Sequence, residues 1–272
     1  MTNGFADKID IIDAETGALV SDIPLGDLPG YDGVQSVAVS GGLLTDNETP
    51  DTLIAVAVST VPGFEVEETP VEGWVVFYDL DGNLVAPVAV GNLPDMVTFS
   101  ENGTYAFSAN EGEAGEPGTD TEGLNPPGSI SVIDLSDFSV QTIGFEGVDI
   151  PDGARIFPGI DPVLDLEPEY IAETDGMLFV TLQEAASVGV FDIETKSWVK
   201  IIPLGATDHS VVPLDAADDG VIDIQTYENL VGMRMPDAIA ATNINGTTYF
   251  LTANEGDDRG DFDEVELGPI GD

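Results

Sequence analysis

Three glutamates follow a turn glycine at nearly the same distance, which is eight, eight and nine residues. The pairs are Gly103 and Glu111, Gly176 and Glu184, and Gly246 and Glu255. If the three segments are structural repeats, the carboxylates come together around a shared axis. Crowded carboxylates repel one another unless a cation lies among them, and such hard oxygen ligands favour Ca²⁺ or Mg²⁺. The spacing therefore predicts a divalent-cation site, in the first place for Ca²⁺, at one mouth of a central channel.

Four aspartates are further candidate ligands. Asp257 lies just past the third glutamate, and Asp208 precedes the only histidine of the chain. Asp215 and Asp219 belong to an acidic run that ends at a glycine, an arrangement that resembles a calcium loop. No glutamate closes this loop as it would in an EF-hand, so an acidic surface turn is the preferred interpretation of the run.

The cation site has a plain alternative. A chain with 52 acidic residues can align three glutamates by chance, or each glutamate can hydrogen-bond the backbone of a neighbouring repeat. The hairpin over 34–59 weakens the symmetry, because it ends in Val58-Ser59-Thr60 without a carboxylate. Both interpretations stay open at the level of sequence.

Catalytic chemistry has few candidate residues. The chain has no cysteine and one histidine, so neither a thiolate nucleophile nor a multi-histidine metal site is available. Asp208-His209-Ser210 contains the three residue types of a hydrolase triad, but neighbours in sequence rarely reach triad geometry. The residues therefore favour a protein without catalysis. If phosphate chemistry occurs in this protein, a metal ion and arginines such as Arg155 and Arg234 would carry it.

The elements that would position these acids are short β-strands in two alternating kinds of hairpin. One kind recurs at 9–26, 74–91, 130–147 and 188–205, and the other at 34–59, 93–111, 166–184 and 235–255. Asn-Gly or Asp-Gly turns mark three hairpins of the second kind. Two hairpins per repeat make a four-stranded unit, and a row of such units is typical of a β-propeller. We therefore expect an all-β propeller of about four four-stranded blades; a β-sandwich would not explain the fixed alternation.

Composition excludes several classes of partner. The formal net charge is −46, so binding to nucleic acid or to an acidic membrane surface is excluded on electrostatic grounds. Hydrophobic residues make up 42% of the chain, which is enough for a substantial core and unlike a disordered protein. No stretch is long and apolar enough to predict insertion in a membrane. The acidity has three ordinary explanations, which are a salty (halophilic or marine) setting, a secreted protein that lives among divalent cations, and solubility alone.

Several runs of residues resemble one known family. They are LPDMVTF (93–99), ANEGE (109–113), DLEPEYIA (165–172), TLQE (181–184), Leu204-Gly205 with DHS (208–210), MPDAIA (235–240) and TANEGD (252–257). In this order and spacing they resemble the choice-of-anchor I domain, over nearly the whole chain. That family consists of secreted bacterial and archaeal propeller domains similar to mesenchyme-specific cell-surface glycoproteins, and it also occurs in large proteins described as alkaline phosphatases.

The resemblance has consequences for domain organisation. Because the family domain is longer, it implies that residues 1–272 form a single propeller domain that is incomplete at both ends. The chain opens on a hairpin of the first kind and closes on one of the second kind. These two pieces would complete one blade in a closed ring of four, but the longer family domain favours an open arc whose remaining blades are the nearest partners.

Three functions follow as hypotheses. The first is a secreted or cell-surface, Ca²⁺-binding scaffold or interaction module without catalysis, whose partner is an extracellular protein or glycan. The second is a metal-dependent phosphoesterase, suggested by the enzymes in which the family occurs. The third is a purely structural piece of a propeller.

Overall fold

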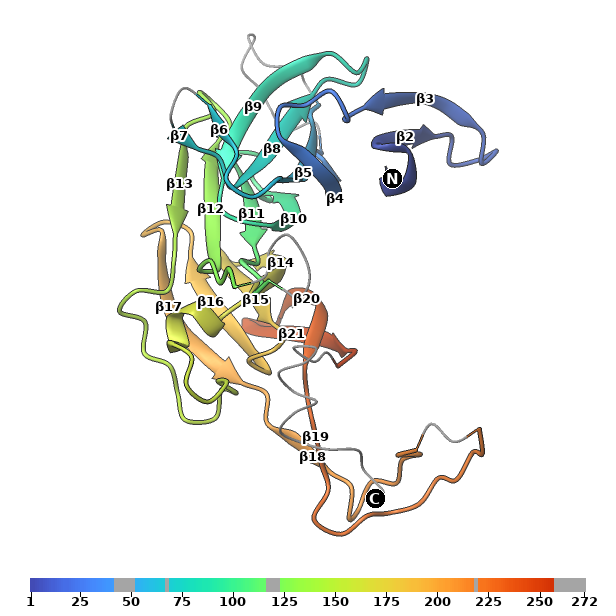
Figure 1. Cartoon of the computed structure of the whole chain (residues 1–272), viewed down its shortest axis with the longest axis vertical. Coiled ribbons are helices and arrows are strands. Elements are labelled where there is room, and N and C mark those ends of the chain that lie inside the picture. Colours follow the sequence, from blue (N-terminus) through green and yellow to red (C-terminus); the bar gives the residue numbers. More distant parts are fainter. Residues whose placement is uncertain (42–51, 67–68, 116–122, 218–219, 257–272) are drawn as a thin grey trace.

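The computed structural model describes residues 1–41, 52–66, 69–115, 123–217 and 220–256. Over these ranges the chain consists of β-strands and two short 3-10 turns, η1 (Gly4–Ala6) and η2 (Pro162–Asp165), without an α-helix. Accordingly, no helix in the described ranges could cross a membrane. Figure 1 shows the strands gathered into separate sheets that follow one another along an open arc. The expected partial propeller is confirmed.

Three sheets are complete antiparallel blades whose strands lie in chain order. Blade I contains β4 (Tyr31–Val39), β5 (Ile54–Thr60), β8 (Gly73–Tyr78) and β9 (Leu84–Val90), with the small hairpin β6 (Glu65–Val66) and β7 (Thr69–Pro70) inserted before β8. Blade II contains β10 (Pro94–Phe99), β11 (Tyr105–Asn110), β12 (Ser129–Asp134) and β13 (Val140–Ile143). Blade III contains β14 (Pro168–Thr174), β15 (Met177–Leu182), β16 (Ser187–Asp192) and β17 (Ser197–Pro203).

Partial sheets lie at the two ends of the arc (Figure 1). The N-terminal sheet has β1 (Thr2–Asn3), β2 (Lys8–Ile12) and β3 (Leu19–Pro24), and the C-terminal sheet has β20 (Pro236–Ile244) and β21 (Thr247–Asn254). A separate ribbon of β18 (Ala206–Asp208) and β19 (Val231–Met233) carries a long loop. The two ends do not form one blade together, so the open arc describes the chain and the ring of four does not.

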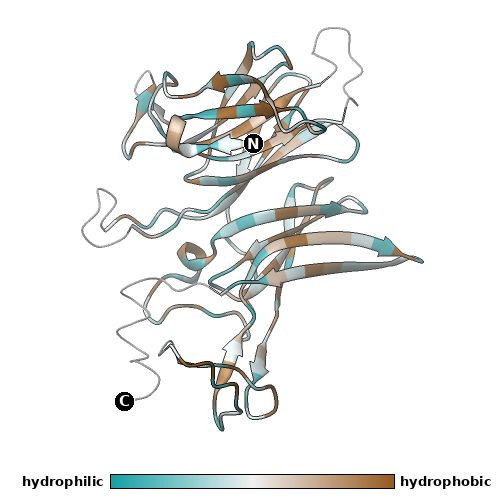
Figure 2. Ribbon diagram, turned by 90° about the vertical axis from the view of Figure 1, so that its right-hand side faces the viewer, coloured by the Kyte–Doolittle hydropathy of each residue, from teal (hydrophilic) through white to brown (hydrophobic). Residues whose placement is uncertain are grey.

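The hydrophobic core lies between blades. Successive side chains of a strand point to opposite faces of the sheet, and both faces of each blade are covered by a neighbour. Phe77 of blade I packs with Val97 and Ile133 of blade II, and Phe107 of blade II packs with Val180 of blade III. Figure 2 shows the corresponding apolar bands along the strands. Full burial of such side chains contributes about 1.5–3 kcal/mol each and holds adjacent blades together.

The first strand of three sheets starts with proline followed by an acid. Pro94, Pro168 and Pro236 pair with Asn110, Leu182 and Asn254 of the neighbouring strands, and the register shifts directly afterwards. Proline lacks an N–H and is tolerated at the start of a strand or at a bulge. The acid after each proline therefore lies in a β-bulge, which changes the direction of its side chain relative to the regular strand.

Candidate cation-binding site

A polar hollow of about 370 Å³ lies where blade II, blade III and the C-terminal sheet meet. Its walls come from the first two strands of each of these sheets and the residues just after them. The lining residues are Asp95, Glu111, Glu169, Tyr170, Gln183, Asp237, Glu255 and Gly256. Five carboxylates thus share one hollow, and two of them, Glu111 and Glu255, are among the glutamates that the sequence indicated.

Strand register shows which residues are equivalent around the hollow. Glu111 follows the partner of Pro94, and Glu255 follows the partner of Pro236. In blade III the residue that follows the partner of Pro168 is Gln183. Gln183 is therefore the structural equivalent of the two glutamates, and Glu184 lies one residue further along the chain.

The turns explain this shift. Asp175 and Gly176 both have positive φ, as a two-residue hairpin turn requires, whereas the turn at Asn102 and Gly103 is longer, with Tyr105 donating back to the Ser100 side chain. Counting residues from the glycine therefore does not reach equivalent positions in the two blades. The pairing register of the strands identifies the equivalent positions.

Glu184 is buried rather than part of the lining. Its side chain is 5% exposed and its carboxyl group is hydrogen-bonded to that of Glu167, which is 2% exposed. Arg155 donates a hydrogen bond to the backbone carbonyl oxygen of Glu184 at 3.4 Å. The negative charge of Glu184 also raises the pKa of Glu169, so it acts electrostatically on the hollow.

Sequence analysis did not assign the three acids that follow the prolines. They are Asp95, Glu169 and Asp237, and all three line the hollow. The signal was present, since the repeated Pro-Asp or Pro-Glu opens each hairpin at the same place. The sequence did not reveal that a β-bulge follows each proline and changes the direction of the next side chain.

Crowding and burial perturb the acids strongly. Burial, and then the charges of Glu184 and Glu111, raise the pKa of Glu169 to about 10. Burial, and then the charge of Asp237, raise the pKa of Asp95 to about 6. Each shift has the same origin: the ionised form loses water and faces other negative charges.

One neutral group relieves part of this repulsion. The side-chain amide nitrogen of Gln183, in the orientation that satisfies both residues, donates to the carboxylate of Glu169.

Among the lining residues none is lysine, arginine or histidine. Within the described ranges, no three carboxylates or histidines stand close enough to form a finished metal site. The hollow thus gathers several carboxyl groups, but among the described residues no three of them lie close enough together to bind one metal ion.

The other candidate ligands lie elsewhere or cannot be placed. Asp208 is exposed at the end of β18, where hydrogen bonding to the side chain of Ser210, and then to its backbone N–H at 2.8 Å, lowers the pKa of Asp208. Asp215 is exposed in the loop of the same ribbon. Asp219 and Asp257 lie outside the described residues. His209 contacts the backbone carbonyl of Val212 through Nδ1 at 2.8 Å, a local loop contact.

Comparisons with known proteins agree with this architecture. The family model of the choice-of-anchor I domain matches residues 2–271. Among solved structures, hydrazine synthase of Kuenenia stuttgartiensis superposes with a TM-score of 0.52 at 14% identity, over 91% of this chain and 65% of that one. A protein of unknown function from Bacteroides thetaiotaomicron (TM-score 0.35, 13% identity) and a eukaryotic initiation factor (TM-score 0.36, 12% identity) are weaker matches.

The coverage of these structures is partial. The Bacteroides protein is matched over 71% of this chain and 34% of its own length, and the initiation factor over 64% and 33%. The chain thus spans about two thirds or less of each of these proteins. The likeness to hydrazine synthase concerns the propeller-like fold alone. A search of curated proteins gave no match.

Proposed function

Because the chain belongs to the choice-of-anchor I family, whose members are cell-surface or secreted β-propeller-like domains, we propose that it is a non-catalytic extracellular module that binds a divalent cation, Ca²⁺ first of all, in the acidic hollow. The cation would hold adjacent blades together. The module would then present its surface to an extracellular protein or glycan.

The observation that carries this proposal is the gathering of five carboxyl groups in one hollow, where burial and crowding raise the pKa of Glu169. A carboxyl group with a pKa of about 10 binds a proton at neutral pH because burial, and then the charges of the other acids, make its negative charge costly. A divalent cation would relieve the same repulsion and compete with that proton. Carboxylate oxygens from several chain segments are also the ligands that Ca²⁺ accepts in flexible geometry.

Five acids are the candidate ligands, and a bound ion would have to draw at least three of them closer together than they lie in the described chain. They are Asp95, Glu111, Glu169, Asp237 and Glu255, each from a strand or strand end that lines the hollow. The amide oxygen of Gln183 is a neutral ligand of the same hard type. Because these residues come from three sheets, binding would couple the sheets more strongly than the apolar contacts alone.

Thermal unfolding tests the proposal. The melting temperature is measured in excess chelator and in millimolar Ca²⁺ or Mg²⁺, for the parent chain and for the double variant Asp95→Asn/Glu169→Gln. We expect Ca²⁺ to raise the melting temperature of the parent and not of the variant. The control variant Asp208→Asn/Asp215→Asn removes the same number of carboxyl groups from exposed positions outside the hollow and should respond like the parent. A parent chain insensitive to both ions would refute the cation site.

A separate assay addresses the phosphoesterase alternative. The proposed module should not hydrolyse a generic phosphomonoester at any tested concentration of Ca²⁺, Mg²⁺ or Zn²⁺. Turnover that is lost in Glu184→Ala would favour the enzyme instead, because the guanidinium-bearing Arg155 and the buried acids lie together in that part of blade III.

A further inference from the structure

A second pocket, of about 670 Å³, lies between blades I and II. Its walls come from the start of β4, the end of β5 and the turn after it, the segment before β10, and the segments after β11 and before β12. Among the described residues, none lines both this pocket and the acidic hollow. We call it the blade I–II pocket, and the lining residues that determine its chemistry are Gln35, Ser59, Phe64, Asn92 and Asn125.

Backbone hydrogen bonds hold the walls of the blade I–II pocket. On the blade I side, the N–H of Val61 donates to the carbonyl oxygen of Gly30 at 2.9 Å. On the blade II side, the N–H of Gly115 donates to the carbonyl oxygen of Leu124 at 2.9 Å. The walls are thus ordered by the chain itself, which lowers the entropy cost of binding a ligand between them.

Phe64 is the aromatic residue among the described lining residues. Its ring lies against Gly30, where an added Cβ atom would be 2.5 Å from two of the ring carbons. Gly30 also has a φ of +72°, so both the close approach and the backbone conformation require glycine. The electron-rich face of an aromatic ring held in this way attracts polarised C–H groups, such as those on one face of a sugar ring.

Three neutral amide side chains also line the blade I–II pocket, those of Gln35, Asn92 and Asn125. The side-chain nitrogen of Gln35 donates to the hydroxyl oxygen of Ser59 at 2.9 Å, which orients this amide. Within the described chain, this is the one side-chain hydrogen bond that the three amides make. An amide both donates and accepts hydrogen bonds, so it matches a hydroxyl group, which does the same.

Asn125 is the least satisfied of the three amides. Its Oδ1 atom is shielded from solvent and accepts no hydrogen bond from any residue that the structure describes. A buried acceptor without a donor is unfavourable. The terminal torsion of asparagine is broad, so this amide can turn toward the pocket that it lines. A hydroxyl group of a ligand would then supply the missing donor.

The acids of the blade I–II pocket are exposed. Asp32, Glu72 and Glu113 line it and remain in contact with water. Exposed carboxylates attract a cationic ligand weakly, because water and salt screen the charge. They accept hydrogen bonds from hydroxyl groups, however, and they repel anions. These acids therefore favour a ligand that carries hydroxyl groups and no negative charge.

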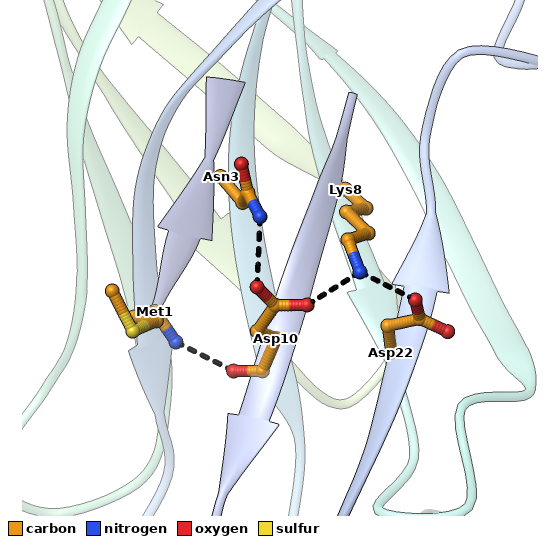
Figure 3. Close-up of polar contacts among 5 residues, drawn as sticks. All are labelled: Met1, Asn3, Lys8, Asp10 and Asp22. Atoms are coloured by element: carbon orange, nitrogen blue, oxygen red, sulfur yellow. Dashed lines mark hydrogen bonds and ion pairs between the residues drawn. The ribbon is translucent and has the colours of Figure 1, made fainter. Parts of the chain in front are cut away.

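The cations of the described chain lie elsewhere. Five of the six lysines and arginines are in the described ranges, and none of the five lines the blade I–II pocket. Figure 3 shows one of them, Lys8, between Asp10 and Asp22 of the N-terminal sheet, at 2.9 and 2.6 Å. A phosphate, a nucleotide or an acidic sugar would thus find no positive partner among the described lining residues.

We propose that the blade I–II pocket binds a neutral sugar residue of a glycan, which stacks on Phe64 and hydrogen-bonds to the amides of Gln35, Asn92 and Asn125. A sugar ring has one C–H face and a hydroxyl-bearing edge, and the pocket offers a partner to each. The volume of about 670 Å³ lies within the range of about 300–1,000 Å³ that small-ligand sites adopt. The proposal selects the glycan from the two partners of the proposed function, and it rests on that function for the extracellular setting alone.

Titration calorimetry in excess chelator tests the proposal. The neutral probes are trisaccharides of glucose, mannose, galactose or N-acetylglucosamine, and the charged probes are trigalacturonate and a glucosamine trimer. We expect at least one neutral probe to bind, and neither charged probe to bind as tightly. Binding of no neutral probe, or tighter binding of a charged one, overturns the proposal. Chelator separates this result from the cation site, because Ca²⁺-dependent stability of the hollow is measured without sugar.

Variants locate the bound sugar. Phe64→Ala should weaken binding of the neutral probe roughly tenfold, whereas Phe5→Ala, at a fully exposed phenylalanine that does not line the pocket, should not. Asn125→Leu should also weaken binding while the melting temperature stays equal or rises, because the unpaired buried oxygen is removed. Affinity equal to that of the parent in both pocket variants would place the sugar elsewhere and overturn the proposal.

Discussion

The carboxyl groups of Glu167 and Glu184 are hydrogen-bonded to each other in the interior of the protein. Such a bond requires a proton on one of them. Burial, and then the charge of Glu184, raise the pKa of Glu167 well above its ordinary value. Together with Glu169 nearby, this pair means that the acidic region holds protons at neutral pH unless another cation takes their place.

This arrangement makes stability depend on pH in an unusual direction. The pKa of Glu169 rises from an ordinary 4.5 to about 10 on folding, so between these values the folded chain binds more protons than the unfolded chain. Stability from this group is complete below about pH 4.5 and is lost as pH rises toward 10. We therefore expect the free energy of unfolding in chelator to fall between pH 5 and pH 8, by up to about 1.4 kcal/mol per pH unit for each such group.

Denaturant unfolding at several pH values measures this slope. Glu169→Gln should flatten it, because the neutral amide does not titrate. Asp192→Asn is the matched control, since hydrogen bonds from Thr195 lower the pKa of Asp192 and place its titration below the tested range. Stability that rises from pH 5 to pH 8 in chelator would contradict the protonated state of the cluster.

Cation binding should release protons. If Ca²⁺ displaces the proton of Glu169, its affinity increases with pH between 6 and 8, and calorimetry in buffers of different ionisation enthalpy detects the released protons. Glu169→Gln should bind more weakly and release fewer protons. Binding without proton release would place the ion away from Glu169.

Much of the architecture could be predicted from sequence because turns and strand patterns are local. Asp175-Gly176 and Asn245-Gly246 form the expected tight turns, with positive φ at all four residues. The alternation of two hairpin types in a fixed order was enough to predict the blades, whereas the open arc was predicted from the greater length of the family domain that the sequence resembles. The tight turns and the repeated order of the hairpins thus determine the strands and their grouping into blades.

The details of the site depend on features that spacing does not reveal. Counting from glycine grouped Glu184 with Glu111, but the different turn lengths make Gln183 the equivalent residue. The contribution of Asp95 depends on a bulge, and a bulge changes the face to which a side chain points. Positions around the axis follow from the strand register, which requires knowledge of the pairing.

Close contact between blades should make Gly128 intolerant of a side chain. A Cβ atom there would lie 2.8 Å from the carbonyl oxygen of Glu111 and would overlap the carbonyl oxygen of Leu166. Backbone cannot move aside as a flexible side chain can, so we expect Gly128→Ala to destabilise the protein by about 1–3 kcal/mol. Gly4→Ala, where nothing lies within 4 Å of the added Cβ, is the control. Equal stability of both variants would show that blades II and III separate easily.

Gln183 offers the most direct test of the hollow as a shared site. Gln183→Glu would place a carboxylate at the position equivalent to Glu111 and Glu255, and would replace the amide that donates to Glu169 with another negative charge. In chelator the variant should therefore be less stable than the parent at pH 8. In Ca²⁺ the charged ligand that replaces the neutral amide should increase affinity, roughly tenfold if it contributes about 1.4 kcal/mol.

Gln183→Met separates charge from the loss of the hydrogen bond. The thioether has similar length but neither donates to Glu169 nor provides a hard oxygen ligand, so this variant should lose stability in chelator without gaining affinity for Ca²⁺. Titration calorimetry on the three chains measures the difference. If the Glu and Met variants bind Ca²⁺ equally, position 183 does not contact the ion. The equivalence of Glu111, Gln183 and Glu255 would then reflect blade geometry without a common ligand.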